Sequence, residues 1–260
     1  MIKADFHVHS SVSIDSKASM EGSVVVAIEK GLEMICFTDH LDIINPYIVW
    51  KQGYKHIEAV RKKYGGQIEI LHGMEIEITE DLTQAEKYIA SDNMDYILGS
   101  THSLPNTEDF FGMNYDSQEM CDDLAVRYLD ETIRLAECDL SDCIAHIGYI
   151  NRYMARYGFQ VDLSKYTDRL EHIFKTLIKN NRGIEINTSG IRQEFGKSFP
   201  GIGLIKMYRD LGGEIITVGS DAHFSKHVGS DFGEVEQLLA QAGFKYYTVF
   251  RGRVAEFVKL

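Results

Sequence analysis

The stretch KADFHVHSS, residues 3–11, places two imidazoles two positions apart behind an apolar opening. Side chains alternate between the two faces of a β-strand, so Asp5, His7 and His9 point one way and the apolar residues between them point the other. Such a strand fits a sheet whose outer surface is covered by helices. We expect Asp5 to orient one imidazole by accepting its second ring N–H.

Short apolar runs alternate with longer amphipathic segments along all 260 residues. Because apolar residues recur with the strand period in the former and the helix period in the latter, these patterns predict alternating strands and helices. We expect strands at 3–8, 32–38, 68–78, 94–101, 142–149, 183–189, 213–220 and 245–250. We expect helices at 20–30, 53–64, 82–90, 117–138, 164–180, 202–211 and 233–242.

This repeated pattern is typical of parallel strands with helical crossovers, closed as a barrel or opened as a doubly wound sheet. Three prolines and the lack of a Ser/Gly-rich linker indicate one α/β domain over residues 1–260. A barrel collects polar chemistry at the carboxyl ends of most strands, whereas a doubly wound sheet concentrates it at one crevice. Every expected strand but the last ends in polar or metal-ligating side chains, which favours the barrel.

Six of the ten histidines fall at these strand ends. TDH at 38–40 and SDAH at 220–223 each set a carboxylate beside an imidazole where an apolar run ends. Two such pairs, together with His-x-His and further histidines at strand ends, indicate a multinuclear metal site rather than isolated ion pairs. A carboxylate can bridge two cations, and we expect Glu75 to do so. Glu77 shares its parity, whereas His72 has the opposite parity and is expected to pack outward.

The composition argues against a nucleic-acid-binding protein and against a membrane-spanning one. A net charge of −12 disfavours the basic surface that nucleic-acid binding needs. No segment approaches the roughly 20 apolar residues of a membrane span, so we expect a cytoplasmic protein with neither a nucleic-acid nor a membrane partner. The four cysteines have spacings unlike those of zinc sites and are expected to be reduced thiols. No sequence pattern specifies the oligomeric state.

In chain order, the motifs HVH, TDH, GMEIE, GSTH, AHIG and SDAH resemble those of the PHP (polymerase and histidinol phosphatase) superfamily, especially its histidinol-phosphate phosphatase branch. The resemblance covers residues 5 to about 230 and includes NTSGIR at 187–192 and the later Pro200. It implies a distorted, TIM-like (β/α)7 barrel with a metal site at the C-terminal ends of its strands. One expected strand, 245–250, is then peripheral.

The resemblance also implies the metal ligands. They are His7, His9, Asp15, His40, Glu75, His102, His146, Asp221 and His223. The first metal would use His7, His9, Glu75 and Asp221, the second Glu75, His102 and His146, and the third Asp15, His40 and His223. Such donors suit zinc, iron or manganese, so we expect two or three of these ions. Asp15 is alternatively a cap for the helix at 20–30, although Ser19 is better placed for capping.

A site of this kind predicts a metal-dependent phosphatase. Water that bridges two such cations ionises near neutral pH, and we expect the resulting hydroxide to attack phosphorus. The candidates for binding the phosphate by planar hydrogen bonds are Arg192, Arg152 and Arg156. The catalytic candidates are Glu75, Asp221, His223 and His227. Of these, His227 is the preferred proton donor to the leaving alkoxide, because a metal-bound imidazole has no free lone pair to carry the proton.

The resemblance implies that the substrate is histidinol phosphate, an intermediate of histidine biosynthesis. The residues alone indicate only a small phosphomonoester. The alternatives are another small phosphate ester, a phosphodiester or nucleotide, or a metal-binding module without catalysis. The acidic net charge disfavours a polymeric substrate. The arginines near the expected site disfavour a module without catalysis, because a storage site has no use for a phosphate clamp.

Overall fold

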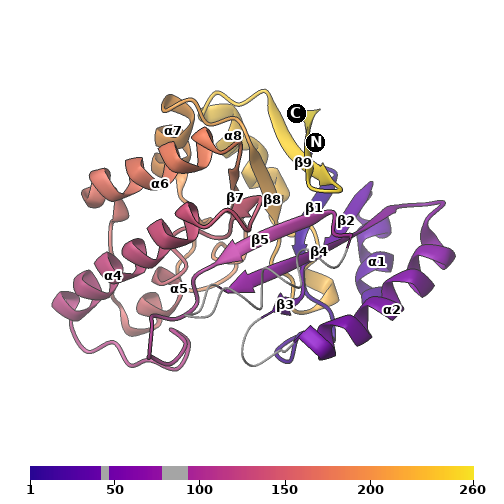
Figure 1. Ribbon diagram of the computed structural model, residues 1–260, viewed down its shortest axis with the longest axis horizontal. Helices are drawn as coiled ribbons and strands as arrows, with labels where there is room; N and C mark the ends of the chain where they lie inside the picture. Colours follow the sequence, from indigo (N-terminus) through magenta and orange to yellow (C-terminus); the bar gives the residue numbers. More distant parts are fainter. Residues whose placement is uncertain (42–46, 78–92) are drawn as a thin grey trace.

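A parallel sheet forms the centre of the computed structural model, which describes residues 1–41, 47–77 and 93–260. Its strands follow the order β1-β2-β4-β5-β6-β7-β8, with β3 paired to β4. They are β1 (Ala4–Val8), β2 (Met34–Phe37), β3 (His40–Leu41), β4 (Glu69–Glu77), β5 (Tyr96–Ser100), β6 (Cys143–Ile144), β7 (Gly183–Asn187) and β8 (Ile216–Gly219). Helices surround the sheet (Figure 1).

The first and last strands of this sheet meet, so that the sheet is nearly closed as a barrel. Val8 of β1 forms a parallel bridge with Ala222, just beyond β8. The His9 N–H donates to the Ala222 carbonyl at 3.1 Å, and the Asp221 N–H donates to the His7 carbonyl at 2.8 Å. The predicted distorted (β/α)7 barrel is therefore confirmed, and its closure joins the histidine-bearing end of β1 to the loop after β8.

The described helices are α1 (Met20–Glu29), α2 (Tyr47–Tyr64), α4 (Gln118–Glu137), α5 (Asn151–Met154), α6 (Thr167–Lys179), α7 (Ile202–Asp210) and α8 (Phe232–Gln241). All of them except α5 overlap the helices that the amphipathic pattern predicts. Ser19 caps α1, because its hydroxyl accepts from the Gly22 N–H at 3.0 Å, and Asp15 is not needed for that role. The helix expected over 82–90 lies outside the described residues.

Some elements differ from the predicted ones. The strand expected over 142–149 ends at Ile144, because His146 has a left-handed backbone with φ of 27° that turns the chain. The short helix α5, which follows this turn, was not predicted. The helix expected over 164–180 is preceded by a 3-10 turn, Leu163–Tyr166, before α6 begins. Tertiary contacts around the site, rather than periodicity, determine these segments.

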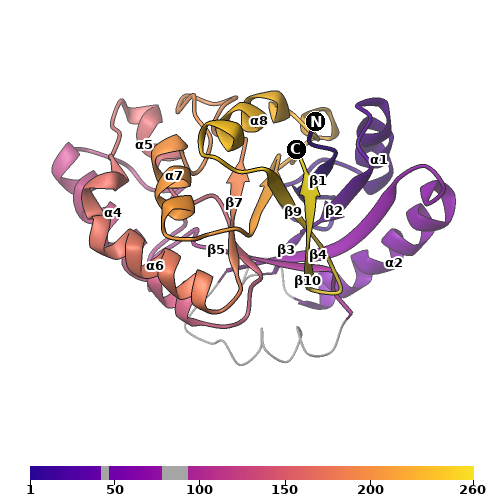
Figure 2. The ribbon, with the colours of Figure 1, turned by 90° about the horizontal axis from the view of Figure 1, so that it is seen from above.

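A C-terminal hairpin lies across the amino ends of the barrel strands (Figure 2). It consists of β9 (Tyr246–Arg251) and β10 (Val254–Lys259). Arg251 lies 2.6 Å from Glu69 at the start of β4, and Arg253 lies 3.0 Å from Asp142 just before β6. The peripheral position expected for 245–250 is confirmed, whereas β10 was not predicted. The hairpin occupies one end of the barrel, and the carboxyl ends of the strands lie at the other.

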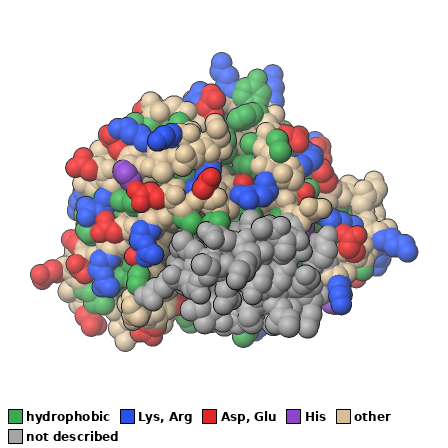
Figure 3. Space-filling model, viewed as in Figure 1, with side chains coloured by type: hydrophobic (Ala, Val, Ile, Leu, Met, Phe, Trp, Pro, Cys, Tyr) green, Lys and Arg blue, Asp and Glu red, His purple; other side chains and the backbone are tan. Residues whose placement is uncertain are grey.

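The surface carries charges of both signs. On the face shown in Figure 3, acidic and basic side chains are interspersed. Within the described part of the chain, no helix is both long and apolar enough to cross a membrane. Of the four cysteines, Cys36, Cys121 and Cys143 are buried and Cys138 is partly buried.

Candidate metal centre and active site

The expected ligands come from the carboxyl ends of many strands of the barrel. His7 lies on β1, His40 begins β3 and Glu75 lies on β4, while the other ligands follow their strands. Two of those that follow strands have left-handed backbones, His146 with φ of 27° and Asp221 with φ of 52°. Residues other than glycine rarely adopt this conformation, and strained positions of this kind concentrate at functional sites.

Glu75 is central to the cluster, and its two oxygens face different histidines. Oε1 lies 3.0 Å from His146 Nε2 and 3.4 Å from His102 Nε2. Oε2 lies 3.3 Å from His7 Nε2 and 3.4 Å from His9 Nε2. Only 1% of the glutamate is exposed. Glu75 thus lies between two pairs of imidazoles, which is the position that bridging two cations requires.

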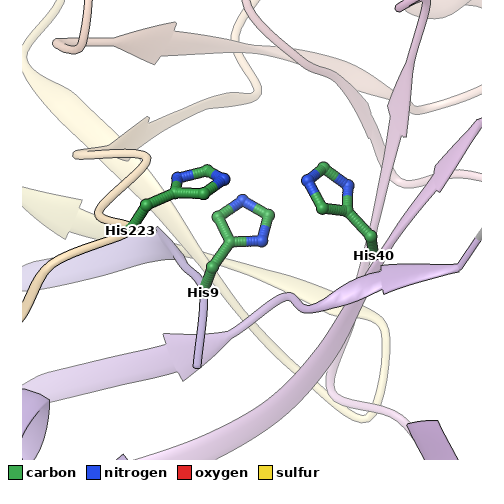
Figure 4. Close-up of side chains that lie close together, drawn as sticks. All are labelled: His9, His40 and His223. Carbon is green, nitrogen blue, oxygen red and sulfur yellow. The ribbon is translucent and has the colours of Figure 1, made fainter. Parts of the chain in front are cut away.

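A third group adjoins the first two. Asp15 Oδ2 lies 2.9 Å from His223 Nε2 and 3.6 Å from His40 Nε2. His40 Nδ1 also lies 3.0 Å from Glu75 Oε2, which links this group to the centre of the cluster. Figure 4 shows the side chains of His9, His40 and His223 pointing toward one another. The ring centroids are 4.3 Å apart for His9 and His40 and 4.1 Å apart for His9 and His223.

Asp221 connects the histidines to an arginine. Its Oδ1 lies 3.5 Å from His9 Nε2 and 3.8 Å from His7 Nε2. The same oxygen lies 3.3 Å from His223 Nδ1. Its Oδ2 accepts a hydrogen bond from Arg152 at 2.7 Å. All nine expected ligands are therefore part of one continuous cluster.

Glu185 on β7 is a buried carboxylate that the sequence analysis missed. His7 Nδ1 donates to it at 2.6 Å, and the His146 N–H donates to its other oxygen at 3.0 Å. Because Glu185 holds the Nδ1 proton, the Nε2 lone pair of His7 faces the cluster. The expectation that Asp5 has this role is wrong: Asp5 accepts from the Ser220 N–H at 2.9 Å and anchors the loop after β8. The available signal was one acidic residue within the apolar strand GIEIN.

The end of β8 approaches this pair closely. A Cβ on Gly219 would overlap both the Glu185 carboxylate and the His7 Cβ. Only glycine therefore allows the strand to pass behind the imidazole and its supporting carboxylate.

A buried network fixes the loop that follows the His-x-His motif. Asp39 accepts hydrogen bonds from Ser10 N at 2.6 Å and from the Ser13 hydroxyl at 2.7 Å. His9 Nδ1 in turn donates to the Ser13 hydroxyl at 3.2 Å. Asp39 thus positions, through Ser13, one histidine of the cluster and the loop that leads to Asp15. The sequence places Asp39 at the end of an expected strand but does not indicate that it contacts Ser10 and Ser13.

The cluster stabilises its own charges. Burial opposes ionisation of Glu75 and Asp221, yet neighbouring cations hold the pKa of both carboxyls well below its usual range, chiefly His7 for Glu75 and Arg152 for Asp221. Burial likewise disfavours a charged His223, but Asp15 and Asp221 prevail and raise its pKa to about 9. Metal ions bind such clusters by replacing the protons on the imidazoles.

The donors fit divalent transition metals. His7 and His9 direct their Nδ1 protons to Glu185 and Ser13, so each presents an Nε2 lone pair, and these two atoms lie only 3.0 Å apart. A shared cation satisfies both lone pairs. Among the described residues, three groups offer one donor atom per residue with those atoms within 4.8 Å of one another: His7, His9 and Glu75; His40, Glu75 and His102; and His9, His40 and His223. Imidazole nitrogen and carboxylate oxygen are donors that zinc, iron and manganese accept.

A cavity of about 630 Å³ opens onto the cluster. Two arginines that line it, Arg152 and Arg192, contact the loop after β8. Arg192 Nη2 donates to the Ser220 carbonyl at 2.6 Å, and Arg152 pairs with Asp221. Arg152 Nε and Arg192 Nη1 are buried and have no hydrogen-bond partner among the described residues. A ligand with several acceptor oxygens is the natural partner for these N–H groups.

The outer part of the cavity wall carries the remaining candidates. Arg156 is exposed and stacks over Tyr153 at 4.8 Å and over Phe111 at 5.5 Å, so it lies at the mouth. His227 also lines the cavity and is partly exposed. Burial and then the nearby Arg192 lower the pKa of His227, which favours its neutral form in the absence of an anionic ligand.

Comparisons with known proteins agree with this arrangement. A family model described as the PHP domain matches residues 5–189. A probable histidinol-phosphatase of Thermotoga maritima is 31% identical, over 94% of each chain. A histidinol-phosphatase of Lactococcus lactis is 26% identical, over 97% of this chain and 96% of that one. A crystal structure of histidinol phosphate phosphatase from Lactococcus lactis, complexed with zinc, L-histidinol and phosphate, has the same fold, with a TM-score of 0.82, 23% identity and 98% of each chain covered.

Proposed function

The chain belongs to the PHP domain family, and from this premise we propose that it is a metal-dependent phosphomonoesterase that hydrolyses histidinol phosphate to histidinol and phosphate. This activity belongs to histidine biosynthesis. The observation that carries the proposal is the position of Glu75 between two pairs of histidines, beside buried arginine donors that have no hydrogen-bond partner among the residues the structure describes. The substrate comes from the relatives, two of which bear the name histidinol-phosphatase at 31% and 26% identity.

We assign the ligands of two metals from the geometry around Glu75. His7, His9, Glu75 and Asp221 would hold the first ion, and Glu75, His102 and His146 the second. A third would lie among Asp15, His40 and His223. The mixture of imidazoles and carboxylates suits zinc, iron or manganese. Such ions supply Lewis acidity, which lowers the pKa of water towards neutrality and offsets the charge of the phosphoryl group.

Arg152 and Arg192 would bind the phosphate. Both residues line the cavity, and their Nε and Nη1 groups have no hydrogen-bond partner within the described chain, so the guanidinium groups can take the phosphoryl oxygens. Their other donors hold Asp221 and the Ser220 carbonyl, so both side chains are oriented before the substrate arrives. Arg156 stacks on aromatic rings at the cavity mouth and would contribute charge rather than a fixed contact.

His227 would carry the proton to the leaving alkoxide. Its lowered pKa favours the neutral form when the site is free. A bound phosphate dianion beside it would raise that pKa and favour the protonated form. His223, by contrast, has both ring nitrogens close to ligand carboxylates and is better placed to hold a metal.

We also propose that residues 1–260 form one domain, because the terminal hairpin lies across the barrel and pairs through Arg253 with Asp142.

Steady-state hydrolysis tests the proposal most simply. The metal content of the protein is measured first, and histidinol phosphate, an aryl phosphate and a phosphodiester are then compared. We expect kcat/KM for histidinol phosphate at or above about 10⁴ M⁻¹s⁻¹, far beyond the other two. Equal and feeble rates on all three would refute the substrate assignment.

A further inference from the structure

Asp109 lies on the wall of the cavity but is not one of the expected metal ligands. It is in the loop after β5, where it forms an antiparallel bridge with Ser103. Its Oδ1 accepts a hydrogen bond from the Phe111 N–H at 2.7 Å, which holds the turn. Among the residues that the structure describes, no Lys, Arg or His nitrogen forms an ion pair with this carboxylate within 4.0 Å. A half-buried negative charge in the cavity therefore lacks a cationic partner within the described chain.

Aromatic side chains line the same cavity as this carboxylate. Phe111 is 67% exposed, and its ring meets the ring of Tyr153 edge-on at 5.9 Å. Arg156 stacks over both rings, so this surface already accepts a cation. Burial is the main reason that the pKa of Tyr149 is raised well above its usual range, and the Asp109 charge adds to this effect. Carboxylate and rings together provide a setting for an organic cation.

The cavity wall therefore carries groups of both charges. Arg152 and Arg192 line it beside the metal cluster, and within the described chain Arg152 Nε and Arg192 Nη1 have no hydrogen-bond partner, so the phosphate would bind there. Asp109 and Phe111, from the loop after β5, line the same cavity and would contact the alcohol portion of the ester. An ester with an anionic phosphate and a cationic alcohol matches both kinds of group.

We propose that Asp109 selects phosphate esters whose alcohol portion carries an ammonium group, by pairing with that group. The assignment rests on the proposed function, since it needs the phosphate to bind at Arg152 and Arg192. It deepens that function by naming the residue that distinguishes a cationic ester from a neutral one. The ion pair would form at one carboxylate oxygen while the other continues to hold the turn.

A matched pair of small esters tests this selection without depending on histidinol phosphate. Alaninol phosphate carries the ammonium group, and propyl phosphate has the same chain without it. We expect the wild-type protein to favour alaninol phosphate over propyl phosphate by at least about tenfold in kcat/KM. This ratio corresponds to the stabilisation that a hydrogen bond to a charged group provides. In Asp109→Asn this preference should disappear, chiefly through a higher KM for the cationic ester.

The asparagine variant is chosen because its side-chain oxygen can still accept from the Phe111 N–H and keep the turn. Glu108→Gln is the control, since Glu108 is the exposed neighbour in the same loop and does not line the cavity. This control should keep the wild-type preference. Calorimetric titration adds a measurement without turnover: Asp109→Asn should weaken the binding of L-histidinol but leave the affinity for inorganic phosphate unchanged.

Two results would overturn the assignment: a wild-type protein that treats both esters alike, or an Asp109→Asn variant that loses activity on both equally. Failure of the proposed function looks different. A wild-type protein that selects alaninol phosphate over propyl phosphate through Asp109, yet does not favour histidinol phosphate, would refute the proposed substrate and support the role of Asp109.

Discussion

At the level of single residues, Glu75 is the side chain on which the proposed chemistry most depends. Its two oxygens are 3.0 Å from His146 and 3.3 Å from His7, so one buried carboxylate touches both histidine pairs. His-x-His and the strand-end histidines could be predicted to meet there, because parallel strands bring their carboxyl ends to one edge. The contacts that Glu185 and Ser13 make with the histidines could not be predicted, since they depend on which strand or loop lies next to each imidazole.

Replacing Glu75 by glutamine should lower both metal content and kcat. An amide oxygen is a weaker ligand than a carboxylate, and the amide nitrogen would face one pair of imidazoles. We expect kcat to fall by about a hundredfold or more, with fewer bound metals by elemental analysis. Glu69→Gln, at the amino end of the same strand, is the control and should retain its metals. Full metal content and activity in Glu75→Gln would rule out bridging.

His227 should matter only when the leaving group needs a proton. In His227→Ala we expect kcat/KM for an alkyl phosphate to fall by about a hundredfold, the usual range for a general acid. An aryl phosphate with a good leaving group should lose little, because its phenolate departs without protonation. Similar losses on both esters would show that His227 binds or positions the substrate instead.

His72 should make the fold sensitive to acid. Only 4% of it is exposed, and burial, with Arg61 adding, lowers its pKa to about 3. Between pH 6.5 and 3 the unfolded chain binds a proton here that the folded chain does not, so stability must fall as the pH falls. Relative to His72→Gln, the wild type should lose about 2 kcal/mol more free energy of unfolding between pH 7 and pH 5. Equal losses, measured by urea denaturation, would mean that His72 titrates normally.

At the level of the elements, the alternation of strands and helices could be predicted, because apolar runs and amphipathic segments differ in period. β10 was missed although the sequence holds a signal for it, since Gly252 and Arg253 separate two apolar runs. In the structure these two residues have left-handed φ values of 54° and 63°, as in a tight hairpin. β6 was predicted too long, because the strain at His146 depends on the site rather than on local sequence.

Two buried carboxylates at opposite ends of the barrel offer a matched comparison. Asp39 holds the Ser10–Ser13 loop, whereas Asp142 accepts from the Ile97 N–H at 2.7 Å and pairs with Arg253. Asp39→Ala and Asp142→Ala should each lower the free energy of unfolding by about 1–3 kcal/mol, since each leaves buried donors unpaired. Only Asp39→Ala should also release metal. Equal metal contents in the two variants would contradict the role given to the Asp39 network.

At the level of the whole molecule, the contacts that stabilise the barrel and the groups proposed to carry the chemistry lie at opposite ends of the strands. The hairpin lies across the amino ends of the strands, and the His/carboxylate cluster occupies the carboxyl ends. A net charge of −12 is compatible with this arrangement because part of the acidity consists of buried carboxylates paired with imidazoles. Composition alone did not distinguish those ligands from an acidic surface.

Metal-dependent release of phosphate from histidinol phosphate is the measurement that tests the account most directly. Protein stripped by a chelator, with its metal content counted, is assayed before and after addition of zinc, manganese or iron. We expect no release without metal, recovery with it, and a higher melting temperature of the reloaded protein, because ligands that bind only the folded state stabilise it. Undiminished release from the stripped protein, or none from the fully reloaded one, would contradict the account.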